Sequence, residues 1–277
     1  MNHEVRDPGR TPPVSVQRQL RQEVGFRCPV PGCGNPYLSW HHFNPPWRGE
    51  HHHRPDNMIA LCLDHAAKAD GDAYSPELLS EWKKTGQAQA KAIEGKFEWM
   101  RRDYIAVIGS NFYYKNATIL QIGDRRCIWF GRDADGYQLM NFWMPTTAAE
   151  PRARVFENGW VVPPTIRDME CPPTGKRLKV WYANGDRIAF EFFDVEGARQ
   201  LVDRYPAAKD WRDYVIFPTT VVEISERAAG SPIEFGPTKT TLPGQNIIRD
   251  SFTGTSGVAI QIGPGPQIHA PALDVEA

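Results

Sequence analysis

The chain changes its pattern of apolar and polar positions near Tyr104. Before that point, the segment from Ser15 to Val24 consists largely of good helix formers, with Ser15 as the predicted N-cap and Gly25 as the predicted end. A second helix is predicted from Pro76 to about Arg102, because apolar residues recur there at helical spacing after a serine N-cap. Two internal glycines weaken this second helix and favour a break in it.

Beyond Tyr104 the apolar runs are short, rich in β-branched and aromatic residues, and separated by turn residues, which is typical of strands. The dipeptides Asp135-Gly136, Asn158-Gly159 and Asn184-Gly185 predict hairpins, because each accepts the positive φ of a type I′ turn. Strands are predicted at 118–122, 126–130, 137–144, 176–182, 186–193, 215–224 and 257–262, with one short helix at 194–204. The sequence therefore predicts an α+β fold whose C-terminal part is a mainly antiparallel sandwich or a partly open barrel.

This pattern divides the chain into five predicted segments. They are a flexible arm (1–14), a domain rich in Cys and His (15–85), a helical linker (86–104), a β-rich domain (105–263) and a tail (264–277). Between residues 26 and 72 the chain lacks periodic apolar structure but is crowded with Cys, His, Pro and Trp. Such a segment cannot build a core from side chains alone, so we expect an ion to organise it.

The overall composition limits the classes of protein that need to be considered. The 277 residues are 41 % hydrophobic and 11 % aromatic, which supports a buried core and excludes a disordered protein. No apolar run approaches the roughly 18 residues of a membrane span, and the polar N-terminus lacks the apolar segment of a signal peptide, so a cytoplasmic location is expected. The net charge of −1 argues against a broad basic face that coats DNA, although a few phosphate contacts remain compatible with it.

Two pairs of soft ligands are separated by a long loop. Cys28 and Cys33 form a C-x4-C pair, and Cys62 and His65 form a C-x2-H pair further along the chain. Two such pairs are the signature of a tetrahedral structural zinc site, so these four residues are the predicted zinc ligands. The chain has five cysteines, and the other two lie in the β-rich part without nearby histidines, where buried free thiols are expected.

The segment between these pairs resembles the HNH endonuclease family in its zinc-knuckle form. The resemblance covers about residues 18 to 85 and rests on motifs that occur in the family's order: His41-His42, Pro45-Pro46, Asn57, Ile59-Ala60-Leu61-Cys62 and His65. It implies a ββα-metal fold that holds one catalytic cation, Mg²⁺ or Mn²⁺, against a phosphodiester. In that arrangement His41 is the first ligand of the cation, His42 is the general base that activates water, and Asn57 fixes the loop that holds the base.

The sequence departs from the family's pattern at one position. The residue after the last zinc ligand is normally a His or Asn that binds the catalytic cation, and here it is Ala66, which cannot. Three explanations stay open: an engineered His-to-Ala change, a natural loss of the ligand, or a shifted ligand set. In the last case His65 serves the catalytic cation, or a histidine from the cluster at 51–53 substitutes.

A loop rich in histidine and arginine lies between the paired histidines and Asn57. The resemblance implies that this loop runs beside the nucleic acid, so Arg48 and Arg54 are candidate phosphate contacts and His53 is a candidate contact or auxiliary ligand. A solvated polar loop is the alternative interpretation. Trp47 is expected to pack this loop against the domain rather than to stack on bases.

The predicted function is hydrolysis of DNA by a metal-dependent HNH endonuclease, with RNA as a compatible substrate and activity impaired by Ala66. Low sequence specificity is expected, because no base-reading element is evident. The layout suggests an effector nuclease of bacterial defence against phage or plasmids, which forms a homo-oligomer through its β-rich domain or binds a partner protein of that system. The alternative is a non-catalytic zinc-stabilised module that binds nucleic acid or protein.

Overall fold

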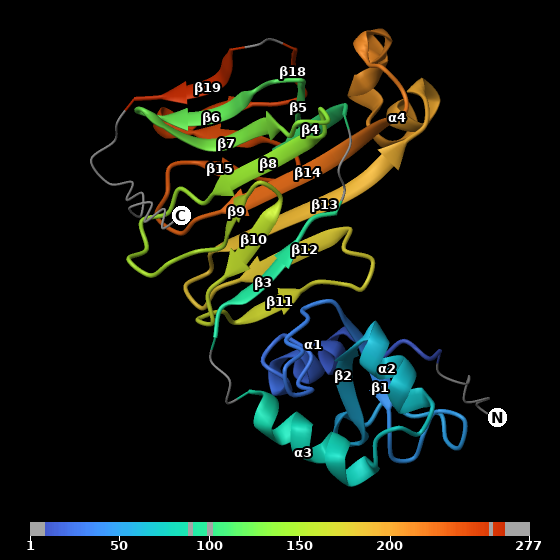
Figure 1. Cartoon of the computed structure of the whole chain (residues 1–277). Coiled ribbons are helices and arrows are strands. Elements are labelled where there is room, and N and C mark those ends of the chain that lie inside the picture. The colour runs from blue at the N-terminus through green and yellow to red at the C-terminus, as the bar shows by residue number, and fades with distance from the viewer. Residues whose placement is uncertain (1–8, 88–90, 99–101, 255–256, 264–277) are drawn as a thin grey trace, which may run out of the picture. The chain divides into compact units, whose positions relative to one another are not determined.

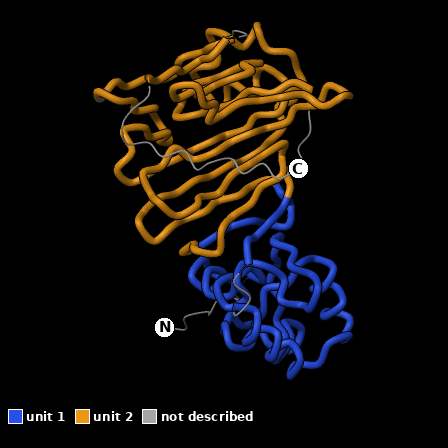
Figure 2. Tube along the Cα trace, turned by 60° about the vertical axis from the view of Figure 1, so that its left-hand side comes forward, with its two compact units in different colours: residues 1–95, 168–175 blue, residues 96–167, 176–277 orange. Residues whose placement is uncertain are grey.

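The computed structural model describes residues 9–87, 91–98, 102–254 and 257–263. The chain divides into two compact units, coloured separately in Figure 2. Unit 1 comprises residues 1–95 and 168–175, and unit 2 comprises residues 96–167 and 176–277. The predicted tail, the first eight residues of the predicted arm and parts of the predicted linker lie outside the described residues.

Unit 1 contains a β-hairpin followed directly by a helix. Its elements are α1 (Val14–Glu23), β1 (Leu38–His42), the 3₁₀ turn η1 (Pro55–Asn57), β2 (Met58–Cys62), α2 (Leu63–Asp70), α3 (Pro76–Gly86), β3 (Ile93–Lys96, whose last residue falls in unit 2) and β11 (Asp168–Glu170). Strands β1 and β2 pair antiparallel, with His41 opposite Ile59 and His42 opposite Met58. Because α2 begins at the residue after β2 ends, the helix starts where the hairpin places it (Figure 1).

A small apolar core holds these elements together. Strand β2 is buried along its whole length, and Leu20 of α1 and Leu79 of α3 are 0 % and 1 % exposed. The buried guanidinium of Arg21 pairs with Asp168 at 3.2 Å, and Arg18 reaches the same carboxylate at 2.8 Å. A buried charge is tolerable only when it is paired, so these bonds attach the segment around Asp168 to α1 within unit 1.

Two sequence predictions about the helices of unit 1 are wrong. Pro13, not Ser15, is the N-cap of α1, and no side chain caps this helix. The second helix ends at Gly86 instead of continuing to about Arg102, and Ile93–Lys96 form a strand. The close approach at Gly86 explains why a glycine stands there, since a Cβ at this position would lie 2.9 Å from Cα of Val24.

Unit 2 is a β-sandwich with a helical cover, and the α+β class is confirmed. In one sheet the strands run in the order β19-β6-β7-β8-β9-β10, and in the other the order is β12-β13-β14-β15-β16-β17. Strand β4 also pairs with β14, β5 pairs with β4, and β18 pairs with β5 (Figure 1). The strands are β4 (Tyr104–Ile108), β5 (Asn111–Tyr114), β6 (Thr118–Ile122), β7 (Arg125–Arg132), β8 (Gln138–Trp143), β9 (Arg154–Phe156), β10 (Gly159–Val162), β12 (Arg177–Trp181), β13 (Arg187–Val195), β14 (Thr219–Arg227), β15 (Glu234–Phe235), β16 (Thr240–Leu242), β17 (Asn246–Ile248), β18 (Phe252–Thr253) and β19 (Val258–Ile262). The edge-to-face contact of Phe142 with Phe190, at 5.1 Å between ring centroids, joins the two sheets across the core.

The outer face of the second sheet carries its own apolar layer. Helix α4 (Ala198–Arg204) and the 3₁₀ turns η2 (Pro206–Asp210) and η3 (Arg212–Tyr214) supply Leu201, Ala208 and Trp211, which pack against Ile105 and Phe112. A third 3₁₀ turn, η4 (Pro243–Gln245), connects β16 to β17. Because η3 precedes β14, the strand predicted from residue 215 begins only at Thr219. Among the described residues, none of the helices has the length and apolar character that a membrane span requires.

The three Gly-containing dipeptides lie at hairpin turns, but their geometry differs from the prediction. Between β9 and β10 the two positive-φ residues are Glu157 and Asn158, one position before the predicted pair. In the other two hairpins only Gly136 and Gly185 have positive φ. The type I′ assignment is therefore wrong for these two, which use longer loops with glycine at the left-handed position.

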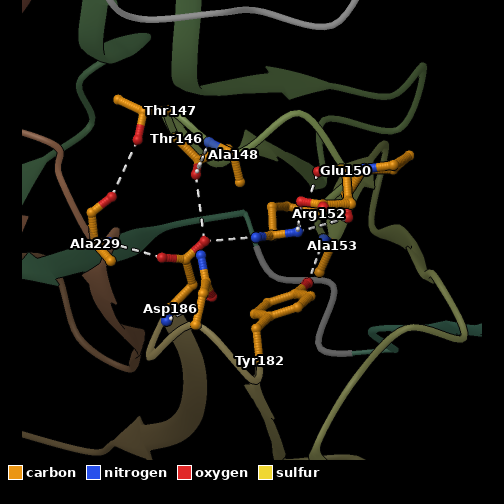
Figure 3. Close-up of polar contacts among 11 residues, drawn as sticks. Thr146, Thr147, Ala148, Glu150, Arg152, Ala153, Tyr182, Asp186 and Ala229 are labelled. Carbon is orange, nitrogen blue, oxygen red and sulfur yellow. Dashed lines mark hydrogen bonds and ion pairs between the residues drawn. The ribbon is translucent and has the colours of Figure 1, made fainter.

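Asp186 holds several segments of unit 2 together (Figure 3). Its carboxylate accepts hydrogen bonds from Nε of Arg152 at 2.7 Å, from the backbone N–H of Ala229 at 2.7 Å and from the hydroxyl of Thr146 at 3.3 Å. Burial works to raise the pKa of Asp186, but the hydrogen bonds from Arg152 and Ala229, the side chain of Asn184 and the charge of Arg152 together lower it below the ordinary value. The side chain therefore remains ionised inside the unit.

Glu226 on β14 lies in a contrasting environment. It is 1 % exposed, and neither carboxylate oxygen has a hydrogen-bond partner among the described residues. Its neighbours across the ladder are the apolar residues Ile188 and Phe235. Burial, together with the negative charge of Asp186, raises the pKa of Glu226 well above its ordinary value. The folded protein therefore holds a proton there that the unfolded chain releases.

We predict that Glu226→Gln stabilises the protein at neutral and alkaline pH. The pKa of Glu226 is higher in the folded protein than in the unfolded chain, where it is about 4.3. The stability that the protonated carboxyl group contributes is therefore complete below about pH 4.3, and it is lost as the pH rises through the pKa of the folded protein. The melting temperature of the variant should exceed that of the parent by a few degrees at pH 8, and the two should converge near pH 4. Calorimetry across this range, with the exposed Glu196→Gln as control, measures the difference. If the melting temperatures of Glu226→Gln and the parent differed by the same amount at every pH, the raised pKa of Glu226 would be wrong.

Candidate metal centre and the adjoining histidine site

The first two predicted zinc ligands lie on a tight loop between α1 and β1. Gly32 and Gly34, on either side of Cys33, have φ values of 79° and 65°, a region that glycine enters at low cost. The loop is closed by a 2.8 Å hydrogen bond from the backbone N–H of Cys28 to the carbonyl of Asn35. This short loop allows both sulfur atoms to face the same point.

The other two ligands come from the junction of β2 and α2. Cys62 ends the strand, His65 lies in the first turn of the helix, and the ligand atoms of all four residues lie within 4.8 Å of one another. Nδ1 of His65 lies 3.1 Å from Sγ of Cys62 and 3.4 Å from Sγ of Cys28, and the sulfurs of Cys33 and Cys62 are 3.8 Å apart. Bonds of about 2.3 Å in a tetrahedron place two sulfur ligands about 3.8 Å apart, so the cluster has dimensions that suit Zn²⁺.

The protonation chemistry of the cluster also favours a cation. Burial raises the pKa of the thiols of Cys28 and Cys62, since a thiolate is poorly solvated there. Burial lowers the pKa of His65, so its imidazole is neutral and has a lone pair to share. A zinc ion would compensate for the buried thiolates, and the Cys₃His cluster is therefore a candidate structural zinc site, in the place where the sequence predicts it.

His41 lies next to a carboxylate at the far end of α2. Its Nδ1 is 3.0 Å from Oδ1 of Asp70, and its side chain is 6 % exposed, whereas that of Asp70 is 52 % exposed. Burial lowers the pKa of His41, and the negative charge of Asp70 opposes this effect. Adjacent ligands of an octahedral cation with bonds of about 2.1 Å lie about 3.0 Å apart, so these two groups have a spacing that suits one Mg²⁺ or Mn²⁺ ion.

Asp70 is the candidate site residue that the sequence interpretation missed. It stands four residues after Ala66, so the two positions share one face of α2. Ala66 itself is half-buried and packs against the core of unit 1. The helical spacing from the expected ligand position was the signal that could have identified Asp70. Because the structure places His65 with the three cysteines, it does not support the explanation that His65 serves the catalytic cation.

His42, the residue that follows His41, is buried and has unsatisfied polar atoms. It is 2 % exposed, and neither ring nitrogen makes a hydrogen bond of good geometry within the described residues, although the backbone of His52 lies close enough to interact with the ring. The rings of Trp47, His52 and His53 surround it, with centroids 4.7, 5.2 and 5.8 Å away. Burial, reinforced by His52 and His53, lowers the pKa of His42 to about 4. At neutral pH the imidazole is therefore uncharged and has an unshared lone pair.

The connection between β1 and β2 is closed by side-chain hydrogen bonds. The amide of Asn57 donates to the carbonyl of Asn44, and the backbone N–H of Phe43 donates to the carbonyl of Asn57 at 3.1 Å. Nδ1 of His52 accepts from a backbone N–H, so its Nε2 carries the proton that is donated to the carbonyl of Pro45 at 3.0 Å. Asn57 thus joins the two ends of the β1–β2 connection.

The predicted nucleic-acid contacts all have partners within the protein. Arg48 pairs with Asp72 at 3.3 Å, and both nitrogens of the Arg54 guanidinium reach Glu50, at 2.5 and 2.8 Å. Nε2 of His53 donates to a backbone carbonyl of the N-terminal arm at 2.9 Å. A phosphate that bound these side chains would therefore share them with, or displace, partners within the protein.

Trp47 packs on histidine rings of its own loop and contacts His42 of β1, with 4.7 Å between ring centroids. Its ring stacks on His51 at 4.5 Å with an interplanar angle of 15°, and on His53 at 5.4 Å with an angle of 23°. These stacked contacts favour the packing role and leave a base-stacking role without support from the structure.

Comparisons of the chain with protein-family models, with curated proteins and with solved structures find no match. The finding that stands is a candidate Cys₃His metal site at the β2–α2 junction, followed along the chain by a large β-rich region.

We predict that Cys28→Ser and Cys62→Ser each abolish the binding of about one zinc ion per chain and destabilise unit 1, because the small core depends on the cluster. Elemental analysis of the purified variants, combined with hydrogen exchange over residues 26–70, measures both effects. Cys127→Ser, which alters a buried free thiol of unit 2, is the control and should keep its zinc. Parent protein without zinc and with full protection in unit 1 would rule out the structural metal.

Proposed function

We propose that the chain is a metal-dependent endonuclease that hydrolyses phosphodiester bonds in DNA, as the resemblance of its N-terminal part to the HNH family implies. The observation that carries the proposal is the adjacency of two unlike histidines at the end of β1. His41 is paired with Asp70, whereas His42 is buried and, within the described residues, has no hydrogen bond of good geometry at either ring nitrogen. Buried polar groups are normally satisfied, so an exception of this kind calls for a ligand or a reaction.

The roles of the residues follow from these environments. His41 and Asp70 would hold the cation, which when bound neutralises charge on the phosphate and stabilises the leaving oxygen. His42 would accept the proton of the attacking water at the one unprotonated nitrogen of its neutral imidazole. Asn57 would keep the β1–β2 connection in place around the base.

Two protein ligands are enough for a cation of this kind. Mg²⁺ is commonly bound through one or two protein groups, with water and substrate phosphates completing the shell. One imidazole and one carboxylate form a mixed set that also suits Mn²⁺. Ala66 then removes a third ligand, which weakens the site. The proposal therefore uses a ligand set different from those expected from the sequence, in which Asp70, one turn beyond Ala66 on α2, would supply the donor atom that alanine lacks.

The second candidate function is a non-catalytic zinc-stabilised binding module. The observation that favours it is Ala66, since the resemblance expects a metal ligand at this position and alanine has no donor atom. The Cys₃His cluster would serve either function, because it stabilises the fold of unit 1 in both.

Plasmid nicking in Mn²⁺ tests the two candidates. We predict that Ala66→His cuts at least about tenfold faster than the parent, because an added ligand strengthens cation binding. In the Ala66→His background, His42→Ala should reduce cutting by about a hundredfold or more, the usual contribution of a general base. Ser80→Ala, on α3, is a control that should leave the rate unchanged. If the Ala66→His protein cuts neither DNA nor RNA at any concentration of Mn²⁺ or Mg²⁺, the binding module is the correct assignment.

For unit 2 we propose a role in self-association. Large apolar side chains are exposed on it, including Tyr214 at 72 % and Phe156 at 63 %. An assembled form would bring several nuclease units together and would provide a means of restraint, as a defence effector requires. Light scattering of the full chain with and without DNA distinguishes a monomer from a homo-oligomer. A monomer under both conditions would favour docking of unit 2 to a different protein.

A further inference from the structure

The N-terminal strap, defined here as residues 9–13, lies against the candidate catalytic site of unit 1. The carbonyl of Gly9 accepts a hydrogen bond from Nε2 of His53 at 2.9 Å. The carbonyl of Pro12 accepts one from Nε2 of Gln17 at 2.7 Å, and Pro12 is buried. The strap is therefore held at both ends, and one attachment point is a histidine that packs against the ring of His42.

Between these attachments, Arg10 reaches the carboxylate that would hold the cation. A terminal nitrogen of its guanidinium lies 3.4 Å from Oδ2 of Asp70, while Oδ1 of the same carboxylate lies 3.0 Å from Nδ1 of His41. Both oxygens of Asp70 are therefore engaged. The charge of Arg10 is also felt by both site histidines, since it adds to the effect of burial in lowering the pKa of His41 and of His42.

A guanidinium and a divalent cation cannot share this carboxylate without cost. The guanidinium does not lose its proton in proteins, so its charge is permanent. Two positive charges held a few ångströms apart repel each other, and each loses part of its attraction to Asp70. A cation that enters between His41 and Asp70 must therefore displace Arg10 or bind more weakly beside it.

We propose that Arg10 is a built-in competitor of the catalytic cation, and that the strap regulates the site by occupying Asp70 until the cation displaces it. This inference rests on the proposed function, because it concerns the same His41–Asp70 pair. It adds a regulatory segment to the site, because the strap holds Arg10 against Asp70. A nucleic-acid phosphate offers Arg10 a second anionic partner, so substrate binding would help to free Asp70.

The competition is measured by Mn²⁺ binding to the full zinc-loaded chain, with electron paramagnetic resonance reporting free Mn²⁺ in the absence of nucleic acid. We expect Arg10→Gln to bind Mn²⁺ about two- to fivefold more tightly, the range that an exposed ion pair supplies. Arg10→Lys keeps the charge and should bind like the parent. Arg199→Gln removes an exposed arginine of unit 2 and is the matched control. The difference between Arg10→Gln and the parent should narrow as ionic strength rises, because salt screens the Arg10–Asp70 pair.

The Asp70→Asn variant separates the failure of this inference from that of the proposed function. If the parent binds Mn²⁺, Asp70→Asn does not, and Arg10→Gln binds no more tightly than the parent, the competition is wrong while the cation site stands. Tighter binding in Arg10→Lys as well as in Arg10→Gln would also overturn it, since charge would then not be the cause. If neither the parent nor Arg10→Gln binds Mn²⁺, the cation site itself is absent, and the proposed function fails together with the inference.

Discussion

The convergence of three cysteines and one histidine on a single point is the constraint on which unit 1 depends. It joins the loop at Cys28 and Cys33 to the junction where β2 becomes α2. The core around it is small, and the connecting loops are rich in proline, glycine and histidine, so apolar burial alone fixes few of these positions. An ion held by all four ligands would set the start of α2, and the helix then places Asp70 two turns later beside His41 on β1. The structural site thus determines the geometry of the chemical one.

The sequence predicted the Cys₃His cluster correctly because the spacing of its residues along the chain follows from the geometry of a short loop and of one helical turn. C-x4-C and C-x2-H spacings predicted a four-ligand cluster, because short loops and a first helical turn can bring such pairs to one ion. Helical spacing puts Asp70 on the same face of α2 as Ala66, but the contact of Asp70 with His41 depends on the packing of α2 against the hairpin, which spacing along the chain does not predict. The ion pairs of Arg48 and Arg54 could not be predicted from the sequence either, because the loop brings their acidic partners close only when it is folded.

The same distinction applies to the fold of unit 2. Short runs of β-branched and aromatic residues between turn residues predicted β6, β12 and β13 closely, because such side chains fit the surface of a sheet. The second helix was predicted too long, since Ile93 and Phe97 also fit a helical stripe, whereas α3 ends at Gly86 and Ile93 begins a strand. The turn types were harder still: Glu157 takes a positive φ that its own residue type disfavours, and the pairing of β9 with β10 imposes it.

The charges around the candidate site explain how a nearly neutral chain could act on a polyanion. Asp70 is bound by Arg10, Asp72 by Arg48 and Glu50 by Arg54, so each nearby positive charge is matched in the free protein. Nucleic acid would then bind by exchange, with a phosphate replacing a carboxylate as the partner of each arginine. The carboxylates released in this way are groups that divalent cations prefer as ligands. Substrate and cation would therefore favour each other's binding, because each removes a competitor of the other, and by thermodynamic linkage the effect must be equal in both directions.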